Sequence, residues 1–135
     1  MNKYLITGGC GFIGSNYIHY LIDNKLSSLV INMDKLTYAG NEENLYSVSK
    51  QKDYHFIEGD IADRKVVRAT LESFDPDVIV NFAAESHVDR SIDKPKEFFR
   101  TNILGTLNLL DEAKNWLKKS NREKRKSFKF IHIST

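Results

Sequence analysis

The sequence contains a single cysteine, Cys10, and only two prolines among its 135 residues. One cysteine cannot form an internal disulfide, so a disulfide-stapled secreted fold is excluded and a reducing, cytoplasmic location is predicted. No apolar run approaches the roughly 18 residues of a membrane helix. The first strand-like stretch, residues 4–7, is too short for the apolar part of an export signal. We therefore expect no membrane partner.

The overall composition is typical of one folded domain. Hydrophobic residues make up 41% and charged residues 28% of the chain, which is too apolar for disorder. The formal net charge is only +2, yet eight of the 20 Lys and Arg residues fall between 114 and 129 beside one acid, Glu123. Nucleic-acid-binding proteins usually spread basic charge over a face and interleave aromatic residues. We interpret the segment as a solvated helix end and loop, with polyanion contact as the alternative, and expect no nucleic-acid partner.

Short β-branched segments alternate with longer segments of helical period, which is typical of βαβ units around a parallel sheet. Strands are predicted at residues 3–7, 29–33, 54–58, 78–82 and 128–133, with both faces apolar as in a sheet covered by helices on each side. The prediction is an α/β fold: a doubly wound, Rossmann-type parallel sheet of about five strands that stops before the end of the fold. Three helices are predicted from apolar residues at helical spacing. The first has the apolar face Ile13, Tyr17, Ile18, Leu21 and Ile22, and the second, capped by Asp63, has the buried face Val67, Leu71 and Phe74. The third begins at Pro95 and has the apolar face Phe99, Ile103, Leu107, Leu110 and Leu117, which we expect to be buried.

A glycine-rich loop joins the first predicted strand to the first predicted helix. Gly8, Gly11 and Gly14 are spaced three apart, which is a variant of the dinucleotide-binding fingerprint. Glycine permits the tight turn and lets a pyrophosphate approach main-chain N–H groups at a helix N-terminus. We expect Phe12 and Ile13 to offer such N–H groups while their side chains face the core.

Asp34 ends the second predicted strand, twenty positions after Gly14. A carboxylate there can accept hydrogen bonds from adenosine ribose hydroxyls and repel a 2′-phosphate, so the pattern predicts NAD rather than NADP, a preference that Lys35 weakens. The alternative is a purely structural turn. Cys10 has no partner thiol or base, so no redox role is expected. No two histidines have ligand spacing with a cysteine or carboxylate pair, so no metal site is predicted.

Five segments together resemble one family closely: residues 7–16, 34–41, 59–61, 81–92, and 101–102 with 105–106. They resemble the dTDP-glucose 4,6-dehydratase family of the extended short-chain dehydrogenase/reductases. The glycine loop is shared across that superfamily, whereas residues 34–41 and 83–92 are much more specific. The resemblance covers essentially the whole chain but only the amino-terminal part of the family's length. It implies that residues 1–135 form a partial NAD-binding domain whose carboxyl-terminal substrate lobe is absent.

The resemblance also implies site residues. Phe12 and Ile13 would hold the pyrophosphate, and Asp60 and Ile61 would flank the adenine, although Asp60 could instead cap a turn. Ser86 and Thr135 would contact the substrate, whereas His87, Asp89 and Arg90 are either ligand contacts or a local polar cluster. The adenosine ribose would be lined by Asp34, Lys35, Leu36 and Thr37, and the floor of the cofactor site by Phe82, Ala83, Ala84, Glu85 and Ser86, with Thr101 nearby.

In the family, the reaction oxidises C4 of a nucleotide sugar by hydride transfer to NAD⁺, eliminates water across C5 and C6, and returns the hydride at C6. This chemistry implies a Tyr-x-x-x-Lys motif and an adjacent Asp-Glu pair. We expect neither in this chain. The chain ends one residue before the Asp-Glu pair would begin. Tyr46 and Lys50 do have the Tyr-x-x-x-Lys spacing, but they lie near the adenosine end, so we interpret that spacing as a coincidence. The chain alone is therefore predicted to be inactive, and the full-length protein to be a homodimer. The alternatives are a non-catalytic NAD-binding module and the cofactor half of another nucleotide-sugar dehydratase or epimerase.

Overall fold

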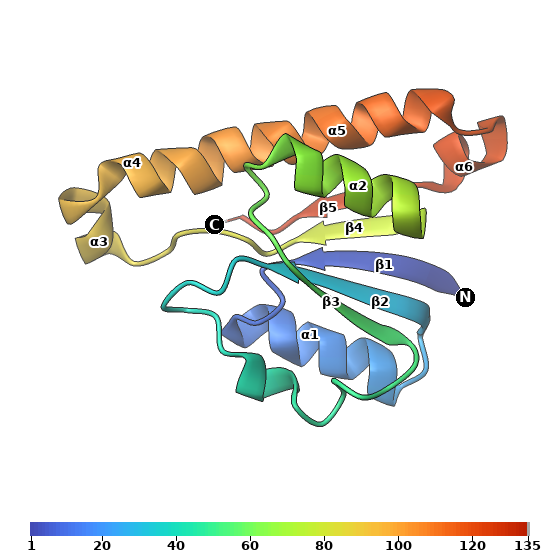
Figure 1. The fold of residues 1–135 in the computed structure, drawn as a ribbon, viewed down its shortest axis with the longest axis horizontal. Coiled ribbons are helices and arrows are strands. Elements are labelled where there is room, and N and C mark those ends of the chain that lie inside the picture. The colour runs from blue at the N-terminus through green and yellow to red at the C-terminus, as the bar shows by residue number, and fades with distance from the viewer. Residues whose placement is uncertain (135) are drawn as a thin grey trace.

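The structure, a computed structural model, describes residues 1–134, apart from the side chains of Val88 and Arg90. Its sheet has five parallel strands in the order β3-β2-β1-β4-β5 (Figure 1). The chain adds strands on one side of β1 and then crosses to the other side, so the strand order reverses between β1 and β4. This confirms the predicted doubly wound sheet. The strands are β1 (Asn2–Thr7), β2 (Ser27–Asp34), β3 (Tyr54–Glu58), β4 (Val78–Asn81) and β5 (Lys129–His132).

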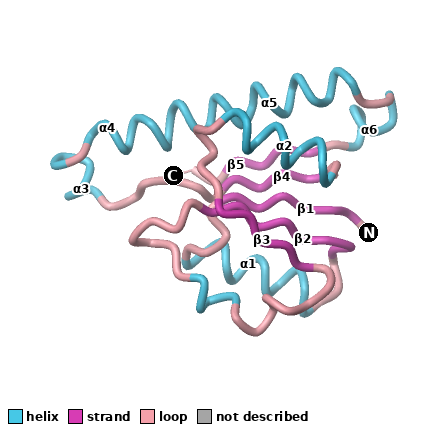
Figure 2. Tube along the Cα trace, viewed as in Figure 1, coloured by secondary structure: helices cyan, strands magenta, loops and turns pink. Residues whose placement is uncertain are grey.

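Helices cover both faces of the sheet (Figures 1 and 2). The helix α1 (Phe12–Asp23) and the 3-10 turn η1 (Glu42–Leu45) lie on one face, and α2 (Arg64–Phe74) and α5 (Thr106–Lys119) lie on the other. Three short segments, α3 (Val88–Asp93), α4 (Pro95–Phe98) and the π-helix η2 (Phe99–Gly105), lead from β4 into α5. The helix α6 (Arg122–Ser127) connects α5 to β5. No helix in the described part of the chain is both long and apolar enough to cross a lipid bilayer.

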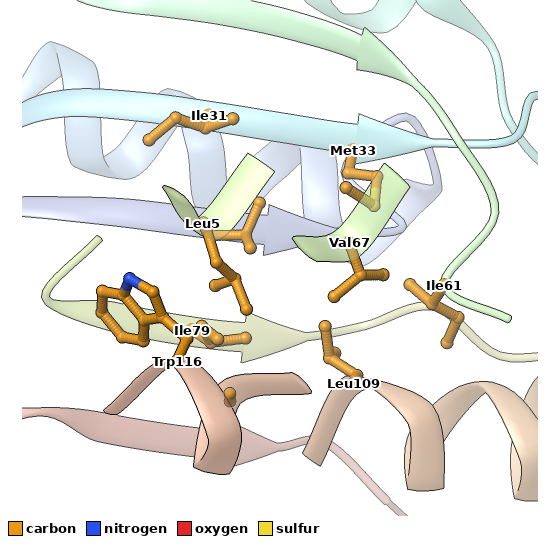
Figure 3. Packing of buried hydrophobic residues seen from close by; sticks show 10 residues of the cluster. Leu5, Ile31, Met33, Ile61, Val67, Ile79, Leu109 and Trp116 are labelled. Atoms are coloured by element: carbon orange, nitrogen blue, oxygen red, sulfur yellow. The ribbon is translucent and has the colours of Figure 1, made fainter. Parts of the chain in front are cut away.

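The core consists of two apolar clusters because successive strand residues point to opposite faces of the sheet. Leu5 and Ile79 contribute to the cluster under α2 and α5, together with Val67 and Leu109 from those helices (Figure 3). Ile6 belongs to the other cluster, under α1. The predicted strands are all present, with no end shifted by more than two residues. Asp63 caps α2 as predicted by accepting hydrogen bonds from the N–H groups of Lys65 and Val66.

Strand β5 departs from the expectation that both faces of every strand are covered. It forms one edge of the sheet and pairs only with β4 among the described strands. Ile131 in β5 is 41% exposed, and Lys129 and His132 are exposed as well. The side-chain pattern was therefore apolar enough to predict the strand but not to show its edge position.

The predicted buried face of the helix after Pro95 is wrong for four of its five residues; only Leu117 packs against the core. Phe99, Ile103, Leu107 and Leu110 are exposed at 55%, 51%, 54% and 44%, and they form an apolar stripe on the outside. The wider turns of η2 change the helical phase before α5 begins. Polar contacts to neighbouring elements then select the inner face, which consists of Thr101, Gly105, Asn108, Leu109, Glu112, Ala113 and Trp116.

The basic segment 114–129 is more ordered than the predicted solvated loop. Residues 122–127 form α6, and the side chain of Lys124 is only 11% exposed. Its Nζ donates hydrogen bonds to the carbonyl oxygen of Asp75 at 2.9 Å and to Oδ1 of Asp77 at 2.7 Å. Lys124 therefore fastens α6 to the turn before β4, while most of the other basic side chains are exposed.

Candidate functional site

A cleft of about 850 Å³ runs along the carboxyl ends of the strands, at the point where the strand order reverses. Open α/β sheets bind their ligands in a crevice at this edge. Leu36 is the one predicted site residue among those described that does not line the cleft; it packs against the cluster under α1 instead. The predicted residues that line it are Gly8, Gly11, Phe12, Ile13, Gly14, Asp34, Lys35, Thr37, Asp60, Ile61, Phe82, Ala83, Ala84, Glu85, Ser86 and Thr101.

The three glycines of the loop after β1 differ in whether the fold requires a glycine at their position. Gly8 has φ +70°, and a Cβ there would lie 2.6 Å from the backbone nitrogen of Ala83. A Cβ at Gly14 would collide with the carbonyl oxygen of Gly8. A Cβ at Gly11 would meet nothing nearer than that same oxygen at 3.4 Å, and its φ of −73° suits any residue. The fold therefore requires Gly8 and Gly14, whereas Gly11 leaves open space beside the cleft.

The N-terminus of α1 opens onto the cleft. Gly11 is the N-cap residue of this 12-residue helix and offers no side-chain hydrogen bond to the first turn. The partial positive charge of a helix N-terminus and its free N–H groups favour an anion. The side chains of Phe12 and Ile13 are 82% and 62% exposed, so the prediction that they face the core is wrong. The buried face of α1 begins at Gly14 and Ser15 instead.

Asp34 connects the glycine loop to the segment after β2. Its side chain is 8% exposed, and its Oδ2 accepts a hydrogen bond from the N–H of Cys10 at 2.9 Å. Its Oδ1 accepts one from the N–H of Leu36, also at 2.9 Å. Each carboxylate oxygen has two lone pairs, so both retain acceptor capacity toward the cleft.

Cys10, whose N–H contacts this carboxylate, is 1% exposed, and its thiol accepts a hydrogen bond from the side chain of Asn32 at 3.4 Å. Burial raises the pKa of Cys10 to about 11, even though the Asn32 side chain acts in the opposite direction. The group is therefore a protonated thiol at neutral pH, the form that is not nucleophilic.

Asp60, which follows β3, caps a turn, as one of the two predicted alternatives has it, and also lines the cleft. Its Oδ1 accepts a hydrogen bond from the N–H of Ala62 at 2.8 Å, so it caps the turn before α2. Its Oδ2 pairs with Arg100 of η2 at 3.2 Å, and the residue lines the cleft. Sequence reasoning missed Arg100, whose partner is 40 positions away in the chain.

The loop after β4 forms the opposite wall, and the buried carboxylate of Glu85 holds it in place. Its Oε2 accepts a hydrogen bond from the hydroxyl of Tyr38 at 3.2 Å, and its Oε1 lies 3.9 Å from Nζ of Lys35. The side chain of Asn102 accepts from the N–H of Glu85 and donates to its carbonyl oxygen. Sequence reasoning assigned no role to Tyr38 or Asn102, although both lie within the segments that carried the resemblance.

Comparison with known proteins shows the family to which the chain belongs. The profile of a family described as GDP-mannose 4,6 dehydratase matches residues 5–135. The chain belongs to the GDP-mannose 4,6 dehydratase family. A curated relative, the dTDP-glucose 4,6-dehydratase of Shigella flexneri, is 50% identical over 133 residues, which are 98% of this chain and 37% of the relative. This confirms the resemblance inferred from the five segments. The chain spans little more than a third of the length of the curated relatives it matches.

Solved structures of related proteins agree with this fold. The dTDP-glucose 4,6-dehydratase of Bacillus anthracis, in complex with NAD, superposes with a TM-score of 0.81 at 35% identity, covering 100% of this chain and 38% of that one. The UDP-glucose 4-epimerase of Thermotoga maritima, with UDP-glucose, has a TM-score of 0.80 at 31% identity, covering 98% and 38%. The fold is therefore common to dehydratases and epimerases, and the sequence is closer to the dehydratases.

The remaining candidates in this member of the GDP-mannose 4,6 dehydratase family do not form a second site. Thr135 lies outside the described residues. His87 lines the cleft with its ring centroid 5.4 Å from that of Tyr38. Nζ of Lys50 lies 5.9 Å from the ring centroid of Tyr46, and neither residue lines the cleft. Within residues 1–134, no group of three or more His, Cys, Asp or Glu residues could hold a metal ion.

The chain does contain an adjacent Asp-Glu pair, but not at the position implied for the family's acid–base pair. Asp111 and Glu112 stand side by side in α5. Glu112 is 2% exposed and accepts hydrogen bonds from Nε of Arg64 and Nε of Arg68, each at 2.9 Å. Neither acid lines the cleft, so this pair connects α5 to α2 and is not placed for acid–base chemistry.

Proposed function

We propose that residues 1–135 are the NAD-binding part of a dTDP-glucose 4,6-dehydratase. The observation that carries the proposal is Gly11, because the fold does not require a glycine there and a ligand that approaches the main chain does. The uncapped N-terminus of α1 lies at the same place and suits a pyrophosphate. Among the solved structures, an identity of 42% to a dTDP-glucose 4,6-dehydratase, against 31% to a UDP-glucose 4-epimerase, favours the dehydratase over the alternative of an epimerase half.

The residues of the cleft fit the parts of a dinucleotide in order. The N–H groups of Phe12 and Ile13 would bind the pyrophosphate, and the free lone pairs of Asp34 would accept hydrogen bonds from the adenosine ribose. Asp60 and Ile61 would flank the adenine, and residues 82–86 with Thr101 would lie under the nicotinamide end. Bound NAD⁺ supplies the chemistry of accepting a hydride from C4 of the sugar and returning it at C6. Ser86 and Thr135 would contact that sugar nucleotide.

Further parts of the proposal concern the whole protein. None of the described cleft residues supplies a Tyr-x-x-x-Lys arrangement or an acid–base pair, so we do not expect these 135 residues alone to turn over dTDP-glucose. The location we propose is the cytoplasm, and the buried, protonated thiol of Cys10 is compatible with a reducing compartment.

The binding proposal is tested by calorimetric titration of the chain with NAD⁺ and, in parallel, with NADP⁺. We expect saturable NAD⁺ binding and much weaker NADP⁺ binding, because the Asp34 carboxylate repels a 2′-phosphate. Asp34→Ala should weaken NAD⁺ binding about tenfold through the loss of charge-assisted hydrogen bonds. Asp23→Ala changes an exposed acid at the other end of α1 and is the matched control. Absence of NAD⁺ binding by the unaltered, folded chain would contradict the proposal.

The homodimer predicted for the full-length protein has a candidate surface. The stripe of Phe99, Ile103, Leu107 and Leu110 runs along the outer side of η2 and α5. Contiguous exposed apolar residues mark interaction surfaces, and a two-fold axis brings the same helix of two copies together. We propose that two copies of the protein pair through this stripe.

Leu107→Glu should therefore weaken self-association, because it places a charge at the centre of the apolar stripe. In sedimentation equilibrium we expect the dimer dissociation constant to rise at least about tenfold. Leu26→Glu, at a leucine that is 43% exposed before β2, should leave the association unchanged. A chain that is monomeric at every concentration, or an equal effect of both substitutions, would remove the stripe as the interface.

A further inference from the structure

The ammonium group of Lys35 is held away from the carboxylate that precedes it in the chain. Lys35 follows Asp34 directly, at the ribose end of the proposed NAD site. Its Nζ donates a hydrogen bond to Oγ1 of Thr101 at 2.9 Å and lies 3.9 Å from Oε1 of Glu85. The side chain thus reaches from the end of β2 to η2 and the loop after β4.

Glu85 is well placed to keep Lys35 there. Its side chain is 6% exposed, against 28% for that of Lys35, so the ion pair is shielded from solvent on the carboxylate side. The hydroxyl of Tyr38 hydrogen-bonds to the other carboxylate oxygen, at 3.2 Å. The carboxylate therefore contacts two residues of the segment after β2.

The π-helix η2 fixes the position of this carboxylate. Two consecutive residues of η2 take part: Thr101, 3% exposed, accepts the hydrogen bond from Lys35, and the side chain of Asn102 bonds to both the N–H and the carbonyl oxygen of Glu85 at 2.8 and 2.9 Å. π-Helical turns occur frequently at functional sites, and here the turn brings neighbouring residues to one cluster.

We propose that Glu85 determines the specificity for NAD over NADP by holding the Lys35 ammonium away from the position of a 2′-phosphate. The inference rests on the proposed NAD-binding function. A lysine next to the ribose carboxylate, once free, would attract a 2′-phosphate and offset its repulsion by Asp34. While its ammonium group is paired with Glu85, Lys35 does not attract a 2′-phosphate, and the negative charge of Asp34 dominates at the ribose end. Glu85 is thus a specificity-determining residue that acts through Lys35.

The test is the ratio of the NADP⁺ and NAD⁺ dissociation constants, measured by calorimetric titration. Glu85→Gln keeps the size of the side chain and one acceptor oxygen but removes its charge, and we expect the ratio to fall about tenfold. The double variant Lys35→Met/Glu85→Gln should restore the original ratio, because the freed cation is then missing. Glu58→Gln is the matched control: Glu58 is an exposed carboxylate at the same edge of the sheet and does not line the cleft.

The gain in NADP⁺ affinity should also shrink as salt is added, since it arises from a charge at a partly exposed side chain. A folded chain that binds NAD⁺ but shows the same ratio with Glu85→Gln would overturn this inference and leave the proposed function standing. An equal loss of affinity for both cofactors would likewise show that Glu85 only maintains the loop. A chain that binds neither cofactor would overturn the proposed function, and the inference with it.

Discussion

Gly11→Ala should weaken NAD⁺ binding about a hundredfold while the protein remains as stable as before. A Cβ at this position meets no atom closer than 3.4 Å, and the backbone conformation, φ −73° and ψ 171°, suits alanine. The added methyl group would stand where the pyrophosphate approaches the first turn of α1. Moving a phosphate out of reach of two N–H groups costs about 1.5 kcal/mol for each charge-assisted hydrogen bond. Calorimetric titration measures the binding, and urea unfolding measures the stability.

Gly14→Ala is the contrasting variant. Gly14 is buried in α1, and a Cβ there would collide with the carbonyl oxygen of Gly8. We expect its free energy of unfolding to fall by about 2 kcal/mol or more, because a backbone clash in a packed turn has no cheap relief. Gly11→Ala, an exchange without strain, should remain within about 0.5 kcal/mol of the unaltered chain. If Gly11→Ala bound NAD⁺ normally, the glycine would have no role in ligand approach.

The strands, their order of appearance and the members of the cleft could be predicted from the sequence, because those features depend on local signals. The carboxyl ends of parallel strands meet at one edge, so Gly8, Asp34, Asp60 and Ala83 had to converge once the strands were assigned. The position of Asp34 relative to the glycine loop then follows from the pairing of β1 with β2. The five segments of resemblance added roles to positions that this geometry already brings together.

The face of α5 could not be predicted, because long-range polar contacts rather than the apolar period select it. Leu107 and Leu110 continue the stronger apolar stripe, yet Asn108 and Glu112 are turned inward. Asn108 donates a hydrogen bond to the carbonyl oxygen of Ile61, 47 positions earlier, and Glu112 bonds to Arg64 and Arg68. A pattern of hydrophobic residues contains no information about such partners.

The cross-cleft contacts of Glu85 were missed for a related reason. Tyr38 is 47 positions away from it in the sequence, and Asn102 is 17 positions away. No local rule connects these residues, and the π-helical register of η2 is not apparent from composition. The segments that carried the resemblance contain all three residues, but the sequence does not show that their side chains contact one another.

Glu112→Gln should lower the free energy of unfolding by about 2 kcal/mol at pH 7. It should also make the free energy of unfolding less dependent on pH in the acid range. Glu112 accepts three hydrogen bonds from the guanidinium groups of Arg64 and Arg68. Such bonds contribute about 1.5–3 kcal/mol each when buried, and the total is smaller here because both arginine side chains are 56% exposed. Glutamine keeps the shape of the side chain, so the loss reflects the charge and the acceptor oxygen that the amide NH2 replaces.

The direction of the pH effect follows from the lowered pKa. The hydrogen bond from Arg68, followed by that from Arg64, holds the pKa of Glu112 below its usual 4.5, and burial opposes this only in part. Burial also raises the pKa of Asp77, but bonds from Lys124 and the Lys3 N–H outweigh it and bring it below 3.8. A carboxyl with a lowered folded-state pKa stabilises the fold fully above its unfolded value and loses that contribution as pH falls through the folded one.

Urea unfolding between pH 7 and pH 2 therefore separates the two acids. The free energy of unfolding of the unaltered chain should fall progressively below about pH 4.5. That of Glu112→Gln should fall less over the same interval, because only the loss that comes from protonation of Asp77 is left. Glu97→Gln is the matched control, because Glu97 pairs with Lys94 at 3.9 Å on the surface and is 55% exposed. Its substitution should change the stability by less than about 0.5 kcal/mol at any pH. Parallel acid profiles for Glu112→Gln and the unaltered chain would mean that the contact between α5 and α2 depends on packing alone and not on this buried charge.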